Sequence, residues 1–184
     1  TGSVSFDATI LEFFGTLLNG SRLILTSQNS LLDLSKLEDT INNMNVNCLW
    51  MTSSWFNSVV ESKIKIFERI NQLIVGGDIV SPIHVKKVFE INPTIKIVNG
   101  YGPTENTTFS TTFEIQNEVY NTIPIGKPIS NSQTYILNDD LQLVGIGVTG
   151  KLYVGGAGIS RGYLNNHELT IEKFILNPFK FGER

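Results

Sequence analysis

Three short apolar runs, separated by segments with helical spacing, constrain the fold of this chain more than any other feature. The runs occupy residues 48–51, 73–75 and 95–98, and each has the length of a buried strand. A helical pattern at residues 53–60 follows the first run, and another at residues 82–90 follows the second. This alternation predicts an α/β fold with a mostly parallel sheet flanked by helices.

The segment before these runs predicts two further helices and one more strand. Apolar residues recur with helical spacing over residues 6–18 and again over residues 32–44, where Asp33 or Ser35 is the candidate N-cap. Residues 22–26, which lie between the two patterns, are predicted to form a strand.

The pattern changes after residue 114, where prolines and glycines separate shorter apolar runs. Residues 133–137, 141–144 and 150–154 predict antiparallel strands joined by tight turns. A short helix is expected near residues 169–174, with Asn166 or His167 as its cap.

We therefore predict two units within the 184 residues: an α/β subdomain at 1–118 and a small, partial antiparallel β-barrel-like subdomain at 119–184. The net charge of −3 provides no basic field for nucleic acid or an anionic membrane, and no apolar run approaches the length of a membrane span. The single cysteine, Cys48, lies in an apolar run and is expected to be buried. One cysteine permits no internal disulfide, which fits a cytoplasmic protein.

The segment at residues 99–110 has the composition of a ligand site. It follows the strand predicted at residues 95–98 and contains two glycines, a proline, several hydroxyls, Tyr101 and Glu105. Open α/β sheets bind ligands at the carboxyl ends of their strands, where glycine permits close approach of the backbone. The ring of Tyr101 can stack on a base, and the carboxylate of Glu105 can hold Mg²⁺.

Each candidate has an ordinary alternative. Glu105, taken alone, is typical of a solvated acid after a turn, and Asp7 is typical of an acid that favours the dipole at a helix N-terminus. His84 and His167 have no cysteine or histidine partner at a metal-binding spacing. The glycines at residues 155–158 predict a β-turn, because no Lys-Ser/Thr pair follows them.

Four segments, in this order, resemble the amino-acid adenylation domains of nonribosomal peptide synthetases, which are adenylate-forming, AMP-binding enzymes. Asn-Gly-Tyr-Gly-Pro-Thr-Glu at residues 99–105 resembles their central nucleotide-site motif. Phe-Asp-Ala at residues 6–8 resembles the amino-acid-anchoring motif. The β-subdomain motif is matched by Gly-Lys-Leu-Tyr-Val-Gly-Gly at 150–156, with Gly158 and Arg-Gly-Tyr-Leu at 161–164. Asn-Pro-Phe at 177–179, with Gly-Glu-Arg at 182–184, resembles the lead-in to the next motif. One departure is Lys151, which stands where the family motif usually has Glu.

The resemblance implies a reaction and its participants. Family members activate an amino acid with ATP and Mg²⁺, release pyrophosphate, and pass the aminoacyl group to the phosphopantetheine thiol of a peptidyl carrier domain. A condensation domain of the same synthetase is the other expected partner. The family's phosphate-gripping loop, its ribose-binding Asp and its catalytic Lys fall outside these 184 residues. We therefore expect an internal fragment that is inactive in isolation.

The resemblance also implies roles for individual residues. Asp7 is expected to pair with the substrate ammonium, Thr104 to hydrogen-bond the α-phosphate, and Glu105 to coordinate Mg²⁺ in a catalytic role shared with Thr104. The nucleotide is expected to contact a set of residues from two turns: Gly77, Asn99, Gly100, Tyr101, Gly102 and Thr104.

The same resemblance implies an amino-acid pocket with an apolar wall. Its expected members are Asp7, Ala8, Leu11, Trp50, Ile74, Gly76, Gly100, Thr108 and Phe109. Asp7 is the only ionisable member, so a charged substrate side chain would be buried without a partner. The set is similar to that of valine-activating members and predicts L-valine, with isoleucine or another short branched residue as runner-up. Two other readings stay open: a different adenylate-forming ligase, such as a D-alanine–carrier-protein or acyl-CoA ligase, and a non-catalytic scaffold or carrier-docking subdomain.

Overall fold

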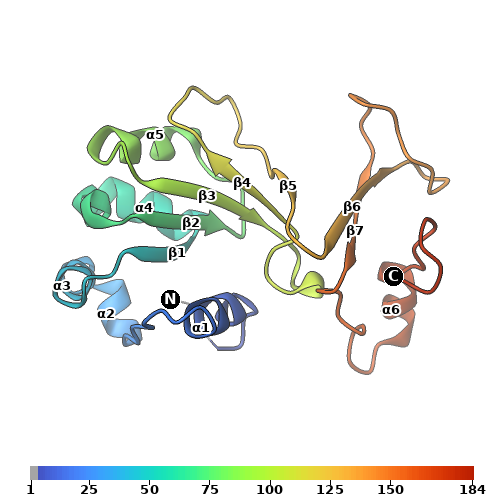
Figure 1. The fold of residues 1–184 in the computed structure, drawn as a ribbon, viewed down its shortest axis with the longest axis horizontal. Coiled ribbons are helices and arrows are strands. Elements are labelled where there is room, and N and C mark those ends of the chain that lie inside the picture. The colour runs from blue at the N-terminus through green and yellow to red at the C-terminus, as the bar shows by residue number, and fades with distance from the viewer. Residues whose placement is uncertain (1–3) are drawn as a thin grey trace.

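The computed structural model describes residues 4–184, which form a five-stranded sheet with helices and a separate two-stranded sheet (Figure 1). The first sheet has the order β1-β2-β3-β4-β5, in which β1 pairs with β2 and β2 with β3 in parallel, while β4 and β5 are antiparallel. The bounds of its strands are Cys48–Thr52 (β1), Gln72–Gly76 (β2), Lys96–Tyr101 (β3), Thr111–Ile115 (β4) and Lys127–Pro128 (β5). The predicted α/β fold is thereby confirmed, and the antiparallel edge formed by β4 and β5 is an addition to it.

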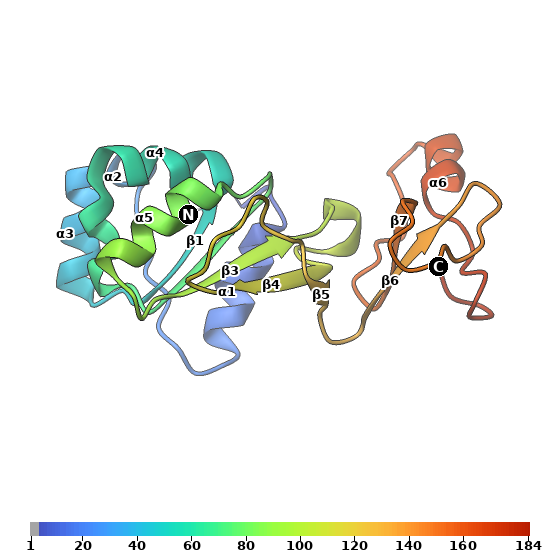
Figure 2. The same ribbon diagram turned by 90° about the horizontal axis from the view of Figure 1, so that it is seen from above.

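One face of the sheet carries the core. Side chains alternate along each strand, so Leu49, Met51 and Val75 point to one face, where they are buried. Two helices, α4 (Ser53–Lys63) and α5 (Pro82–Ile91), cover that face (Figure 2). The short 3₁₀ helix η1, Ile64–Arg69, connects α4 to β2 and contacts both α4 and α5.

The opposite face is less covered. Trp50, Ile74 and Val98 lie side by side on β1, β2 and β3 and are half-buried. Gly76 and Gly100 follow them on the same face at the carboxyl ends of β2 and β3. This half-open apolar face, ending in two glycines, is available to line a ligand pocket.

The N-terminal segment forms three helices: α1 (Ala8–Leu17), α2 (Gln28–Leu32) and α3 (Leu34–Met44). The Asp33 carboxylate accepts hydrogen bonds from the backbone amides of Ser35 (3.1 Å) and Lys36 (3.3 Å), so Asp33 caps α3. The strand predicted at residues 22–26 is wrong, because this segment is irregular and no neighbouring strand pairs with it among the described residues. A strand needs such a partner for its backbone hydrogen bonds.

Cys48 is exposed, which contradicts its predicted burial. It begins β1, the edge strand of the described sheet, and its side chain points away from the core that Leu49 and Met51 enter. Its thiol is still partly desolvated by neighbouring atoms, which raises its pKa. Within residues 4–184, no helix has the length and apolarity to cross a membrane.

The C-terminal module consists of the antiparallel pair β6 (Ser132–Leu137) and β7 (Lys151–Gly156) with helix α6 (His167–Lys173). Asn166, one of the two predicted caps, accepts a hydrogen bond from the amide of Leu169 (3.1 Å). The strand predicted at residues 141–144 is wrong: the segment makes only an isolated bridge, between Leu143 and Leu137, after the Asn138 turn. The sheet changes between Pro128 and Ser132, and the division at residue 118 stays a prediction.

Candidate functional site

Strands β1, β2 and β3 end at the same edge of the sheet, and the 99–110 segment leaves the sheet there. Thr52, Gly76 and Gly100 are neighbours in the register of the three strands. A single 3₁₀ turn, η2 (Thr104–Asn106), follows β3 before the chain returns as β4. This is the edge at which open α/β sheets bind ligands.

Glycine is required at two positions on this edge. A Cβ added to Gly76 would lie 2.1 Å from the carbonyl oxygen of Gly100, and one added to Gly102 would lie 2.5 Å from the carbonyl oxygen of Thr108. Both obstacles are backbone atoms, which cannot rotate away as a flexible side chain can. The close approach of backbone to backbone explains why the sequence has glycine at these places.

An apolar pocket wall forms above the two glycines. The rings of Trp50 and Phe109 meet edge to face with centroids 5.3 Å apart. A Cβ added to Gly100 would lie 2.6 Å from the Phe109 ring, and one added to Gly76 would lie 3.3 Å from the tip of Trp50. Ile74 lies between these residues on β2, in register with Trp50. The structure therefore brings together five members of the predicted amino-acid pocket.

Asp7 connects helix α1 to this pocket. Its carboxylate accepts a hydrogen bond from the amide of Thr108 (3.0 Å), and its carbonyl accepts one from the Thr108 hydroxyl (2.9 Å). Thr108 has a positive φ of 62°, which is uncommon for a β-branched residue, and these two bonds hold it there. Ala8 begins α1, and Leu11 lies one helical turn from Asp7 on the same side. Both are half-buried.

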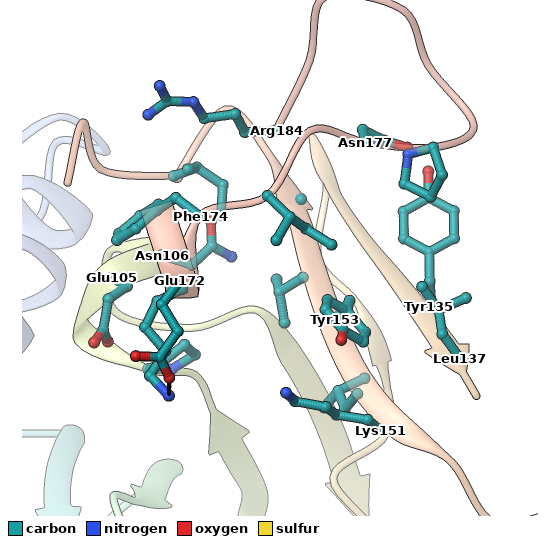
Figure 3. Close-up of a pocket in the computed structure, with 18 of the residues that line it drawn as sticks. Glu105, Asn106, Tyr135, Leu137, Lys151, Tyr153, Glu172, Phe174, Asn177 and Arg184 are labelled. Carbon is teal, nitrogen blue, oxygen red and sulfur yellow. Dashed lines mark ion pairs between the residues drawn. The ribbon is translucent and has the colours of Figure 1, made fainter. Parts of the chain in front are cut away.

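The other side of the 99–110 segment faces a cavity of about 300 Å³ between the sheet and the C-terminal module. Tyr101, Pro103 and Glu105 line it from the segment, with Tyr153 on β7 and Phe174 beyond α6. Figure 3 shows Glu105 and Glu172 on one side of this cavity, and Tyr135 and Leu137 on the other. Tyr101 is 38% exposed, so part of its surface is accessible to a ligand.

Glu105 is one of the two acidic side chains among the described residues that line this cavity, and Glu172 is the other. The hydroxyl of Tyr163 donates a hydrogen bond to the Glu105 carboxylate, and this bond lowers the pKa of Glu105, with its own backbone amide as a smaller cause. The same contact raises the pKa of the Tyr163 hydroxyl, which therefore stays protonated and remains a donor. Glu105 is thus ionised at neutral pH, and its oxygens can coordinate a cation.

The ionised Glu105 carboxylate fits a site in which Mg²⁺ is coordinated by oxygens of both the protein and the substrate. Among residues 4–184, no group of three or more His, Cys, Asp or Glu side chains is arranged to hold a metal by itself. Mg²⁺ in nucleotide sites is commonly bound by one or two carboxylates, with phosphate and water oxygens completing the shell. The ionised carboxylate of Glu105, which lines this open cavity, is compatible with that donor set.

The remaining predicted residues differ in how they are placed. Thr104 is exposed on η2, next to Glu105. The side chain of Asn99 is buried and donates to the carbonyl of Pro124 (2.8 Å), so it holds a loop of the same chain. Gly77 has a positive φ of 79° in the turn after β2, with open space where a Cβ would stand.

Two further residues support the site and received no role from the sequence. Tyr163 contacts Glu105. The sequence feature that could have pointed to Tyr163 is its place in the Arg-Gly-Tyr-Leu motif at residues 161–164. Ser53 is buried at the start of α4, and its hydroxyl contacts the carbonyls of Gly76 (3.2 Å) and Asp78 (2.9 Å). Nothing in the local sequence distinguishes Ser53 from an ordinary residue near a helix start.

Comparisons with known proteins agree with this arrangement. The family model of the AMP-binding enzymes matches residues 1–164. The chain is 48% identical to part of tyrocidine synthase 3 of Brevibacillus parabrevis, over 183 residues that make up 100% of this chain and 3% of that protein. It is 47% identical to part of gramicidin S synthase 2 of Brevibacillus brevis, over 184 residues that make up 100% of this chain and 4% of that protein.

Solved structures show the same likeness in three dimensions. An NRPS protein containing adenylation and PCP domains, PA1221, superposes with a TM-score of 0.93 at 33% identity, over 100% of this chain and 37% of that one. The N-terminal subdomain of NpsA from Klebsiella oxytoca, in complex with 3-hydroxybenzoyl-AMSN, gives a TM-score of 0.84 at 28% identity, over 100% of this chain and 47% of that one. The chain thus spans a small part of the curated relatives and less than half of these solved chains.

Proposed function

Because the chain belongs to the AMP-binding enzymes and, among them, to the adenylation domains of nonribosomal peptide synthetases, we propose that it forms the substrate-binding centre of a domain that activates L-valine with ATP. The product is an aminoacyl-adenylate, which the parent synthetase transfers to the phosphopantetheine thiol of a carrier domain and hands on to a condensation domain. The 184 residues match only a small part of the synthetases that they resemble.

The observation that carries the proposal is the position of the 99–110 segment between two surfaces. On one side, Gly100 and Phe109 meet Trp50 in the apolar pocket wall, beside Asp7 and Thr108. On the other side, Tyr101 and Glu105 line the cavity. Such a segment can hold an amino acid and a nucleotide next to each other, as attack of a carboxylate on a phosphate requires.

Valine is favoured by the size and polarity of the pocket. Trp50 and Phe109 limit its depth, and Ile74 adds an apolar surface. Asp7 supplies the negative charge that a substrate ammonium needs, because a partly desolvated ammonium is stable only beside an opposite charge. Discrimination by one methylene is worth only about 1–3 kcal/mol, so we expect isoleucine to be activated too, at a lower rate.

In the reaction, each group has one task. The Asp7 carboxylate binds the substrate ammonium and so directs the substrate carboxylate toward the nucleotide. Tyr101 stacks on the adenine, and the Thr104 hydroxyl donates a hydrogen bond to the α-phosphate. Glu105 holds Mg²⁺, which offsets negative charge on the phosphates when it is bound. The backbone at Gly76, Gly77, Gly100 and Gly102, with Asn99, leaves room for both substrates.

The test is amino-acid-dependent exchange of pyrophosphate into ATP, measured on the full-length protein. We expect valine to support the fastest exchange and isoleucine a slower one, while phenylalanine and lysine support almost none. A protein that turns over phenylalanine or lysine faster than valine would contradict the valine assignment. Loss of exchange with every amino acid would contradict the adenylation function itself.

The isolated 184-residue chain should show no valine-dependent exchange, and its binding of ATP should be weak or undetectable. The reason is that the predicted half-site offers Tyr101, Thr104 and Glu105 but not the phosphate-gripping loop, the ribose-binding Asp or the catalytic Lys that the family uses. Equilibrium dialysis with labelled ATP provides the measurement. Exchange by the isolated chain at a rate comparable to the full-length protein would overturn this part of the proposal.

A further inference from the structure

Residues 158–163, between β7 and α6, hold the turn that carries Glu105. The amide of Ser160 donates to the carbonyl of Glu105 (2.8 Å), and the hydroxyl of Thr107 donates to the carbonyl of Gly158 (3.1 Å). A Cβ added to Gly158 would lie 2.8 Å from the amide oxygen of Asn106, so the two segments are also in close contact. The hydrogen bond from the Tyr163 hydroxyl to the Glu105 carboxylate is a further contact between the two segments, and it joins residues 58 positions apart.

Tyr163 is itself held in place by two neighbours. Its amide donates to the hydroxyl of Thr170 on α6 (2.9 Å), and that hydroxyl also bonds the carbonyl of Asn166 (2.8 Å). Its ring meets the ring of Phe174 edge to face, with centroids 5.5 Å apart. The backbone and the ring are therefore fixed independently of the hydroxyl, whose one described partner is Glu105.

We propose that Tyr163 is a positioning residue for Glu105: its hydroxyl orients the carboxylate that holds the divalent cation of the Mg–ATP complex. This inference rests on the proposed function. A carboxylate on a one-turn 3₁₀ helix at a partly exposed position has several rotamers available, and a phenol donor on a rigid support selects one of them. The hydroxyl occupies one carboxylate oxygen, Oε1, and fixes the direction in which the group faces the cavity.

The test compares Tyr163→Phe with the wild type in the full-length protein, because Phe keeps the ring against Phe174 and removes only the hydroxyl. The first readout is binding of Mn²⁺ with α,β-methylene-ATP, followed by water-proton relaxation. We expect the dissociation constant of the metal–nucleotide complex to rise at least about tenfold, as for loss of other partners of metal ligands. Affinity for the same nucleotide in EDTA should not change.

The second readout is the dependence of valine-dependent pyrophosphate exchange on Mg²⁺ concentration. Tyr163→Phe should shift the half-maximal Mg²⁺ concentration upward by a similar factor, while the KM for valine stays as in the wild type. Tyr120→Phe is the matched control: this hydroxyl does not line the cavity, accepts a hydrogen bond from the amide of Gln116 (3.2 Å) and has no described contact with Glu105. It should leave both readouts unchanged.

Failure of the inference and failure of the proposed function can be told apart. If Glu105→Gln abolishes metal-dependent nucleotide binding and Tyr163→Phe behaves as the wild type, Glu105 acts without Tyr163 and the inference is wrong. If Glu105→Gln also keeps wild-type metal binding and exchange, the proposed role of Glu105 fails first. A fall in thermal stability of Tyr163→Phe with unchanged metal affinity identifies a merely structural hydroxyl and also refutes the inference.

Discussion

The two parts of this molecule differ in what holds them together. Residues 4–128 contain a continuous apolar core between the sheet and helices α4 and α5, with residues such as Phe56, Phe67 and Met51 fully buried. Within residues 129–184, all of which the structure describes, only Leu137 and Gly155 are buried. That module relies on strand pairing and on two aromatic pairs, Tyr135 with Phe179 and Tyr163 with Phe174.

The candidate site therefore combines a rigid half, formed by residues 4–128, with a more weakly held half, formed by residues 129–184. The amino-acid pocket is built on β1, β2 and β3, which belong to the large core. The Glu105 carboxylate instead takes its described side-chain partner, Tyr163, from the C-terminal module. We therefore expect the pocket for the amino acid to be preformed, while the orientation of Glu105 depends on the module staying attached.

The largest effect is expected from Phe67→Ala, which attacks the core of the first part. Phe67 is fully buried and meets Phe56 edge to face with centroids 5.8 Å apart. Its truncation should lower the free energy of unfolding by about 3–5 kcal/mol, because it removes apolar contact and leaves a cavity. Urea unfolding of the 184-residue chain measures this change. A loss of less than about 1 kcal/mol, well below the expected range, would mean that the core around Phe67 is far less tightly packed than described.

A somewhat smaller effect is expected from Gly76→Ala at the sheet edge. The new Cβ would lie 2.1 Å from the Gly100 carbonyl, so β2 and β3 must separate locally, at a cost of about 2–3 kcal/mol. The same change at Gly15 on α1 is the matched control, because the nearest atom there lies at an ordinary contact distance of 3.6 Å. Alanine at Gly15 should be neutral or slightly stabilising, since alanine favours helix. Equal effects at the two positions would show that the close approach of β2 and β3 is unimportant.

Shortening a buried side chain inside the C-terminal module should have a local effect. Leu137→Ala removes the one buried apolar side chain among residues 129–184 and should destabilise that module by about 2 kcal/mol. Limited proteolysis should then cleave residues 129–184 faster, while residues 4–128 resist as in the wild type. Equal acceleration of cleavage in both parts would show that the two parts unfold together.

The smallest effect is expected at a surface cluster on the first part. The Glu61 carboxylate lies 2.6 Å from Lys87 Nζ and 3.0 Å from His84 Nε2, and the hydrogen bond and charge of Lys87 lower its pKa, with His84 contributing less. A lowered pKa in the folded state means that this cluster stabilises the fold above the ordinary value of 4.5 and loses that contribution as the pH falls through the lower, folded pKa.

Glu61→Gln should therefore reduce the fall in melting temperature on acidification below pH 4.5, with little change elsewhere in the molecule. Glu90→Gln on α5 is the control, because Glu90 is exposed and has no described ion pair within residues 4–184. Melting curves recorded between neutral pH and acid make the comparison. Identical acid profiles for Glu61→Gln and the wild type would rule out a contribution from the cluster.

Much of the fold followed from local patterns. The strands at β1, β2 and β3 and the helices at α4 and α5 were predictable because each has an unbroken apolar run or helical spacing with clear stop signals. The predicted strand at residues 22–26 failed, because β-branched and aliphatic residues favour a strand only where a partner offers backbone hydrogen bonds. The strand β4 was missed for the opposite reason: β3 supplies its partner, and the local sequence gives no strong pattern.

The candidate site was predictable in its members more than in its contacts. Through family resemblance, the motif at residues 99–105 and the surrounding segments gave Glu105, Tyr101 and the pocket residues as candidates. The contacts of Asp7 with Thr108, and of Tyr163 with Glu105, join residues 101 and 58 positions apart. No spacing rule relates such residues, since their proximity depends on how the sheet, α1 and the C-terminal module pack.

The sequence by itself determined the alternation of strands and helices, the glycines at the sheet edge and the family to which the chain belongs, because these depend on neighbouring residues and on motifs read in order. Tertiary structure alone decided which side of the 99–110 segment faces which surface. It also placed the Tyr163 hydroxyl on Glu105 and left Cys48 exposed at the sheet edge. Those outcomes are set by the packing of segments far apart in the chain, which no local pattern encodes.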